Sequence, residues 1–129
     1  MSKKFYISDL HIDHTNVLAF DNRPFKDVEE MNNELIRRWN DVVSDGDLVY
    51  ILGDMFWCAP KKAMPIMEQL NGQKILVKGN HDRFLHNSKA KSALAGIKDY
   101  DDICVTLEDG TQRRVILSHY FIPMYIGHR

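Results

Sequence analysis

Cysteine is scarce in this chain of 129 residues, which contains only Cys58 and Cys104. The two residues form no Cys-x-x-Cys pair, and nothing around them suggests export. The sequence therefore favours two buried free thiols over a disulfide. The same scarcity argues against a structural zinc site of the cysteine type, so a metal ion would be held by oxygen and imidazole nitrogen.

The chain also lacks an excess of charge and a long apolar run. Its 17 Lys and Arg residues face 18 Asp and Glu residues, which gives a formal net charge of −1. Without a basic excess nucleic acid is not a favoured partner, and no run of like charge indicates a tail. No apolar segment is long enough to span a membrane or to form a signal-peptide core. We expect one domain over residues 1–129 of a soluble, cytoplasmic protein with no membrane partner.

Hydrophobic patterning in the first part of the chain predicts strands that alternate with helices. Short apolar runs predict strands over residues 3–8, 48–52 and 74–78. A helix is expected over 27–43, with Asp27 as its N-cap, because one face carries apolar side chains spaced 3, 4, 4 and 3 residues apart. The stripe that we expect in the core consists of Val28, Met31, Leu35, Trp39 and Val42.

Weaker signals complete the expected fold. A helix is expected over 60–70, where Pro65 should bend it or delay its start. A short helix is plausible over 88–95. The last third of the chain predicts a β-hairpin with Asp109-Gly110 at its turn and strands over 103–107 and 113–117. This order predicts an α/β fold with a mainly parallel sheet and an antiparallel addition.

Polar clusters follow the expected strands, each at the point where a strand runs out. All of them offer oxygen or imidazole nitrogen ligands, and the carboxyl ends of strands in α/β sheets converge on one edge. Each cluster alone has an ordinary explanation as a turn or a core histidine, but core packing rarely produces such a series in order. The clusters are Asp9-Leu10-His11, Gly53-Asp54, Gly79-Asn80-His81-Asp82 and Ser118-His119.

The types and spacing of these side chains predict a site for two metal ions. Asp9 and His11 are two residues apart, so in extended backbone they point the same way and can chelate one ion. Asp54 could bridge two ions with its two oxygens, while Asn80 and His119 could serve the second. Mixed nitrogen and oxygen ligands favour Mn²⁺, Fe or Zn²⁺. Two ions roughly 3.5–4 Å apart would clamp a phosphate and activate a water molecule.

Residues beside the expected metal ligands suggest further roles. His81 could donate a proton to a leaving alkoxide, and Asp82 could hold the ring of His81 in one tautomer. Gly53 and Gly79 would let the backbone approach the ions without a side-chain clash.

Other loop residues are candidates for substrate binding. His14 and Asn16 could line the pocket or be solvated loop residues. Arg23 could bind a phosphate or pair with an acid. Phe56 and Trp57 could form an aromatic pocket wall or pack in the core.

The clusters together resemble the first four signature blocks of the calcineurin-like metallophosphoesterases. Residues 8–16, 23–25 and 117–120 are most similar to the small phosphoesterases of bacteria and phages. The resemblance implies an α/β/β/α sandwich with mixed sheets. It also implies that Asp9, His11 and Asp54 hold the first metal ion, that Asp54, Asn80 and His119 hold the second, and that His81 is the catalytic histidine.

The family has a fifth block, Gly-His-x-His, whose two histidines complete both metal sites. This chain ends at Gly127-His128-Arg129, so His128 is either a metal ligand or a bystander. We expect the true block to lie beyond residue 129 in a longer parent protein. The last strands of the second sheet would then also be missing, which would leave an exposed edge and favour a homodimer.

The sequence therefore predicts a metal-dependent phosphoester hydrolase, acting on monoesters or diesters through two divalent ions and a metal-bound hydroxide. Mn²⁺ is the expected metal, with Fe, Zn²⁺ and Ni²⁺ as alternatives. The expected substrate is a phosphorylated small molecule or a nucleotide. Alternatives are a nuclease of the same superfamily, a non-catalytic metal-binding or scaffold protein, and a dimer in which a partner chain supplies the missing histidines.

Overall fold

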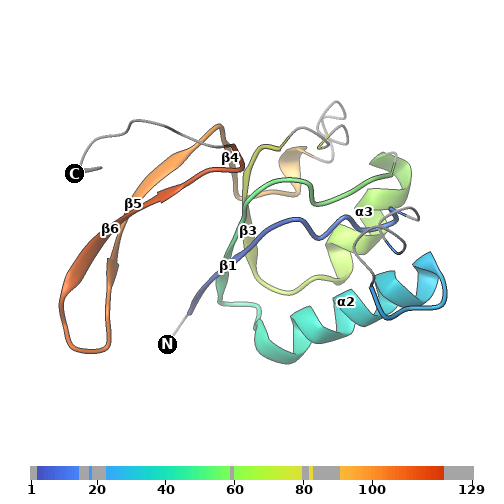
Figure 1. Cartoon of the computed structure of the whole chain (residues 1–129), viewed down its shortest axis with the longest axis horizontal. Coiled ribbons are helices and arrows are strands. Elements are labelled where there is room, and N and C mark those ends of the chain that lie inside the picture. The colour runs from blue at the N-terminus through green and yellow to red at the C-terminus, as the bar shows by residue number, and fades with distance from the viewer. Residues whose placement is uncertain are drawn as a thin grey trace.

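The computed structural model describes residues 3–14, 18, 23–58, 60–79, 82 and 91–120. Within these residues a four-stranded sheet has the order β1-β2-β3-β4, and a separate two-stranded sheet pairs β5 with β6 (Figure 1). The elements are β1 (Lys4–Ile7), α2 (Val28–Val42), β2 (Leu48–Ile51), α3 (Pro60–Gln69), β3 (Gln73–Val77), β4 (Gly96–Lys98), β5 (Asp101–Thr106) and β6 (Gln112–Leu117).

All pairings in the larger sheet are parallel, and both of its central strands are largely buried. Helix α2 connects β1 to β2, and α3 connects β2 to β3, as the alternating pattern predicted. Since β1, β2 and β3 run side by side in one direction, the loops that follow them emerge at one edge of the sheet. The predicted α/β class is confirmed.

Helix α2 has the N-cap that the sequence predicts. The side chain of Asp27 accepts a hydrogen bond of 2.8 Å from the backbone N–H of Glu30, and the helix ends where Val43 adopts extended backbone. The apolar stripe is buried at Met31 and Trp39, but Val42 is 60 % exposed, so its prediction as a core residue was wrong. Val42 lies at the open edge of the sheet, beside β1, where no further strand of the described chain covers it.

Helix α3 runs through Pro65 without a delayed start, contrary to one of the two predicted effects of this proline. Proline lacks the N–H that would bond to the carbonyl one turn earlier. Pro65 lies on the exposed side of the helix, while Ala63, Ile66 and Met67 face the core. Burial of the apolar face of α3 thus stabilises the helix and offsets the missing hydrogen bond at Pro65.

Two hydrophobic clusters lie on opposite faces of the parallel sheet. On one face, Val49, Ile51 and Leu76 pack with the apolar sides of α2 and α3. On the other, Tyr50 and Val77 pack with the β5-β6 hairpin through its buried Leu117. Figure 1 shows the helices and the hairpin on opposite sides of the sheet. The described residues thus form the helix, sheet and sheet layers of the expected α/β/β/α sandwich, and among them one sheet is parallel and the other antiparallel.

The later elements depart from the predictions in detail. Strand β4 was not predicted, because three residues of which one is glycine give no strand pattern. The short helix expected over 88–95 is helical only at residues 91–92 among those described. The predicted hairpin is present, but its turn is a three-residue loop. Leu107 and Thr111 pair across it, and Gly110 has the left-handed φ of 85° that such loops need.

Both cysteines are free, as predicted, but neither is fully buried. Cys58 is half-buried, and burial raises the pKa of its thiol to about 11. Cys104 lies on the exposed face of β5, where side chains alternate between the two faces of the strand.

An apolar recess of about 270 Å³ lies between β1 and α2. Its lining contains no carboxylate and no imidazole, so it does not coincide with the predicted metal site. No helix in the described part of the chain is long and apolar enough to cross a membrane.

Candidate metal centre

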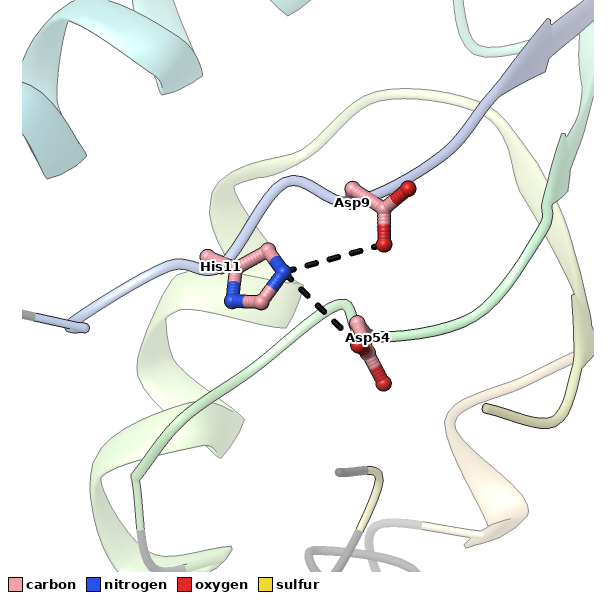
Figure 2. Close-up of side chains that lie close together, drawn as sticks. All are labelled: Asp9, His11 and Asp54. Carbon is pink, nitrogen blue, oxygen red and sulfur yellow. Dashed lines mark ion pairs between the residues drawn. The ribbon is translucent and has the colours of Figure 1, made fainter. Parts of the chain in front are cut away.

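The side chains of Asp9, His11 and Asp54 converge beyond the ends of β1 and β2 (Figure 2). The Nε2 atom of His11 lies 3.7 Å from a carboxylate oxygen of Asp9 and 3.7 Å from Oδ2 of Asp54. One ligand atom from each residue lies within 4.8 Å of the other two. The Asp54 side chain is buried at 6 % exposure, whereas that of Asp9 is 53 % exposed, so the cluster opens to solvent on the Asp9 side.

Backbone hydrogen bonds join the two loops that carry these residues. The parallel pairing of β1 and β2 continues past the strand ends, because Asp9 and His11 donate to the carbonyls of Gly53 and Asp54 over 3.3 and 3.0 Å. Further along, Ile12 donates to Met55 over 2.9 Å. These bonds fix the position of one loop against the other. The convergence of the three side chains therefore follows from sheet pairing that reaches into the loops.

The backbone conformation at the site differs from the predicted extended one. Asp9, His11 and Asp54 all have left-handed φ values, of 53°, 50° and 50°. Such a conformation costs on the order of 1–3 kcal/mol at a residue other than glycine and is concentrated at functional sites. Leu10 and Ile12 anchor the first loop in the core with exposures of 6 % and 1 %. The burial of these alternate residues holds the strained Asp9 and His11 in place.

His119 follows the end of β6 and reaches the same centre from the second sheet. Its Nε2 lies 3.5 Å from Oδ2 of Asp54, and its Nδ1 lies 2.9 Å from the carbonyl oxygen of Leu52. A carbonyl oxygen only accepts hydrogen bonds, so Nδ1 of His119 is the donor to Leu52, and in a neutral ring Nε2 is the nitrogen left for a metal ion. This geometry suits the predicted role of His119 as a metal ligand, and that role stays a prediction.

Asp54 lies close to both histidines. Its Oδ2 is 3.7 Å from Nε2 of His11 and 3.5 Å from Nε2 of His119. Two ligand atoms that share an ion with bonds of about 2.1 Å lie roughly 3.0–3.4 Å apart. Small side-chain movements would therefore suffice to close the carboxylate and imidazole ligands around an ion.

The two glycines of the clusters allow a close approach of side chains, whereas the predicted approach of the backbone to metal ions stays a prediction. A Cβ atom on Gly53 would lie 2.3 Å from Nδ1 of His119, and one on Gly79 would lie 2.6 Å from Oδ1 of Asp54. Both distances are shorter than any non-bonded contact that a carbon atom tolerates. Any other residue at these positions would push His119 or Asp54 away from the centre.

Asp82 connects the second and third loops. Its carboxylate accepts hydrogen bonds from the backbone N–H groups of Asp54, Met55 and Gly79, over 3.0, 2.9 and 2.7 Å. The side chain is buried, and its hydrogen bonds fix the backbone that carries Asp54. Its predicted role in holding the ring of His81 stays a prediction, because His81 lies outside the described residues.

The site has the composition and position expected of a known family. A sequence model of that family, described as calcineurin-like phosphoesterase, matches residues 5–127. The chain belongs to the calcineurin-like phosphoesterase family. The match covers Asp9, His11, Asp54 and His119 and confirms the resemblance that their spacing indicated.

Relatives of this family member occur in archaea, phages and bacteria. A crystal structure of a protein of unknown function from Aquifex aeolicus superposes on 97 % of the chain, and on 65 % of its own, with a TM-score of 0.69 and 28 % identity. Among sequences, an uncharacterized protein of Methanocaldococcus jannaschii is 49 % identical over 86 residues, which are 65 % of this chain and 49 % of that protein.

Two phage proteins extend the comparison. The Gene 66 protein of Mycobacterium phage L5 is 38 % identical over 64 % of this chain and 41 % of its own length. The Gene 66 protein of Mycobacterium phage D29 is 28 % identical over 98 % of this chain and 66 % of its own. The chain thus spans about half the length of the first curated relatives that it matches. These phage relatives support the likeness to small phage-type phosphoesterases.

Arg23 supports the first ligand loop of this phosphoesterase domain. Its guanidinium donates to the carbonyl oxygens of Asp9 and Leu10 over 2.9 and 2.7 Å. Neither of the two alternatives drawn from the sequence anticipated this contact, since a bond to a backbone carbonyl leaves no sequence pattern. The planar fork of arginine suits two adjacent acceptors. A phosphate-binding role for Arg23 stays a prediction.

The aromatic residues near the site have separate roles. Phe56 is 1 % exposed and belongs to the core, which excludes it from a pocket wall. Trp57 is 40 % exposed and stacks on His14, with ring centroids 3.8 Å apart. His14 is only 6 % exposed, so the alternative of a solvated loop residue was wrong. Its Nδ1 lies 2.9 Å from Nδ1 of His11.

Several predicted site residues lie outside the part of the chain that the structure describes. Their roles as ligands, as the catalytic histidine or as substrate-binding residues stay predictions. These residues are Asn16, Asn80, His81 and His128.

Proposed function

We propose that this chain hydrolyses phosphoesters with two divalent metal ions bound around Asp54. Asp9, His11 and Asp54 would hold one ion, and Asp54 and His119 would contribute to the second. The observation that carries this proposal is that Oδ2 of Asp54 lies near two imidazole nitrogens, Nε2 of His11 at 3.7 Å and Nε2 of His119 at 3.5 Å. A single buried carboxylate shared by two nitrogen ligands suits a bridged pair of ions better than one ion alone.

The donors fit hard and borderline divalent ions. Carboxylate oxygens and imidazole nitrogens, without a thiolate, suit Mn²⁺ first, with Fe, Zn²⁺ and Ni²⁺ as alternatives. The orientation of His119 supports this fit, because its Nδ1 contacts the Leu52 carbonyl and its Nε2 faces Asp54. Such ions would neutralise charge on a phosphate and lower the pKa of water.

The chain's own residues would orient the ester and move protons. The half-exposed Asp9 marks the open side of the centre, from which a phosphorylated small molecule or nucleotide would enter. Gly53 and Gly79 keep the loops close enough for Asp54 to reach both imidazoles. We assign proton donation to the leaving oxygen to His81, which follows the last residue of β3, Val77, by four positions in the sequence.

A hydrolysis assay on the full chain tests the proposal. With Mn²⁺ present, we expect turnover of bis-p-nitrophenyl phosphate or p-nitrophenyl phosphate, lost with EDTA and in the Asp54→Asn variant. Asp41→Asn is the matched control, because Asp41 is a 60 % exposed residue at the end of α2 that pairs with Arg37. Activity should persist in this control. A folded, Mn²⁺-loaded chain that cleaves neither ester would contradict the proposal.

A further inference from the structure

The two ring nitrogens of His11 face different neighbours. Nε2 is directed at the carboxylates of Asp9 and Asp54, whereas Nδ1 lies on the opposite side of the ring, as Figure 2 shows. That second nitrogen is 2.9 Å from Nδ1 of His14. Two nitrogens at this distance share a hydrogen bond, in which one ring donates and the other accepts.

His14 is itself held in one orientation. Its ring stacks on the indole of Trp57 with an angle of 7° between the planes, and its side chain is buried. Its backbone N–H donates to the carbonyl of His11 over 3.0 Å, and the N–H of Trp57 donates to the carbonyl of Ile12 over 2.8 Å. The orientation of the His14 ring is therefore set by packing and by the backbone of the same two loops.

We propose that His14 is a positioning residue for the metal centre, an inference that rests on the proposed function. In this arrangement Nδ1 of His14 accepts the proton of His11 Nδ1–H. The proton then stays on the far side of the His11 ring, and the Nε2 lone pair faces the ion. Metal-binding histidines depend on such a partner for both tautomer and ring orientation. Trp57 would keep the accepting ring of His14 in place.

The alternative is that His14 only fills space. If His14 only packs, a flat ring against Trp57 is enough and the ring nitrogen has no effect. If His14 positions His11, a hydrogen-bond acceptor is needed at the position of Nδ1. Phenylalanine keeps a flat ring and removes the acceptor. Asparagine loses most of the ring but places an oxygen near the position of Nδ1. The two substitutions therefore separate the two roles.

Mn²⁺ affinity, measured from the signal of free Mn²⁺ by electron paramagnetic resonance, is the first readout. For His14→Phe we expect roughly 10- to 100-fold weaker binding, the usual loss when a ligand histidine loses its partner. His14→Asn should recover most of that affinity. Binding that is lost in His11→Ala identifies the relevant site, and circular dichroism establishes that each variant is folded. The reverse order would overturn the proposal. In that case His14→Phe would bind Mn²⁺ about as tightly as the unchanged chain, and His14→Asn would bind it more weakly.

Nitrogen NMR of the Zn²⁺-loaded chain gives a second readout that packing alone does not move. We expect His11 to carry its ring proton on Nδ1 and His14 to carry its own on Nε2. A proton on Nδ1 of His14 would contradict the inference.

The outcomes separate this inference from the proposed function. If the unchanged chain hydrolyses esters and His14→Phe binds Mn²⁺ as tightly as the unchanged chain, only the inference about His14 is contradicted. The expected order of Mn²⁺ affinities in a chain that hydrolyses no ester defeats the function alone. A chain that binds no Mn²⁺ at His11 defeats both.

Discussion

Gly53 lies directly against the ring of His119. A Cβ atom at this glycine would be 2.3 Å from Nδ1 and 2.6 Å from Cγ of that histidine. The two residues come from different sheets, since Gly53 follows β2 and His119 follows β6. Their contact is therefore a point where the antiparallel hairpin is docked onto the ligand loops of the parallel sheet, and it determines how His119 reaches Asp54.

We expect Gly53→Ala to weaken both folding and metal binding. Its left-handed φ of 84° costs about 1–2 kcal/mol for alanine, and the clash displaces His119 in addition. Gly110→Ala is a matched control, because Gly110 has a φ of 85° and no atom within 4 Å of the added Cβ. Urea unfolding should show a lower free energy of unfolding in both variants than in the unchanged chain. Mn²⁺ titration should show roughly tenfold weaker binding in Gly53→Ala only. Equal Mn²⁺ affinity in the two variants would contradict the proposed contact.

Asp82→Asn should destabilise the chain by about 1–3 kcal/mol, the cost of leaving a buried donor without its acceptor. The carboxylate accepts from three backbone N–H groups through two oxygens, whereas an amide has one oxygen and must turn its NH₂ toward a donor. Urea unfolding measures the change, with Asp41→Asn as the exposed control of the same chemistry. An effect no larger than that of Asp41→Asn would show that these three hydrogen bonds contribute little.

Arg23→Lys should lower Mn²⁺ affinity several-fold while keeping the positive charge. Lysine cannot supply the planar pair of donors that contacts the carbonyls of Asp9 and Leu10, so the first ligand loop loses one of its supports. A phosphate-binding role for Arg23 predicts a different result, a raised KM with unchanged Mn²⁺ affinity. Measuring the Mn²⁺ dissociation constant and KM in the same variant decides between the two.

Asp47→Asn should lower stability near neutral pH and have a smaller effect in acid. Hydrogen bonds from the backbone N–H groups of Ser44 and Lys3 hold the pKa of Asp47 below its usual value. Because the folded-state pKa is depressed, the stabilisation is complete above the unfolded pKa of about 3.9 and is lost as pH falls through the folded value. Urea unfolding of both proteins between pH 7 and pH 3 tests this. If the difference in free energy of unfolding between the two proteins stays constant over this pH range, the acceptor at position 47 is not a charged carboxylate.

The local parts of the fold were predictable because their causes lie within a few residues. The capped helix α2 followed from Asp27 and the spacing of apolar side chains, and the parallel sheet followed from alternating strands and helices. Asp9, His11 and Asp54 could be named as candidate ligands because they follow β1 and β2, and parallel strands deliver such residues to one edge whatever their sequence separation. His119 follows β6 of the antiparallel sheet, so its approach to Asp54 depends on how the two sheets pack.

Other features of the site depend on contacts between distant segments. The left-handed backbone of Asp9 and His11 is held by hydrogen bonds to the second loop, so the extended geometry assumed for that pair was wrong. The carbonyl contacts of Arg23 likewise have no signature in the order of residues.

The sequence by itself determined which side chains could bind a metal and at which strand ends they lie, because residue type and periodicity are local properties. The tertiary structure alone decided that Asp54 lies close to both His11 and His119 and that Nδ1 of His14 meets Nδ1 of His11. Those relationships depend on how loops and sheets pack. Packing is a property of the whole core, and short stretches of sequence do not encode it.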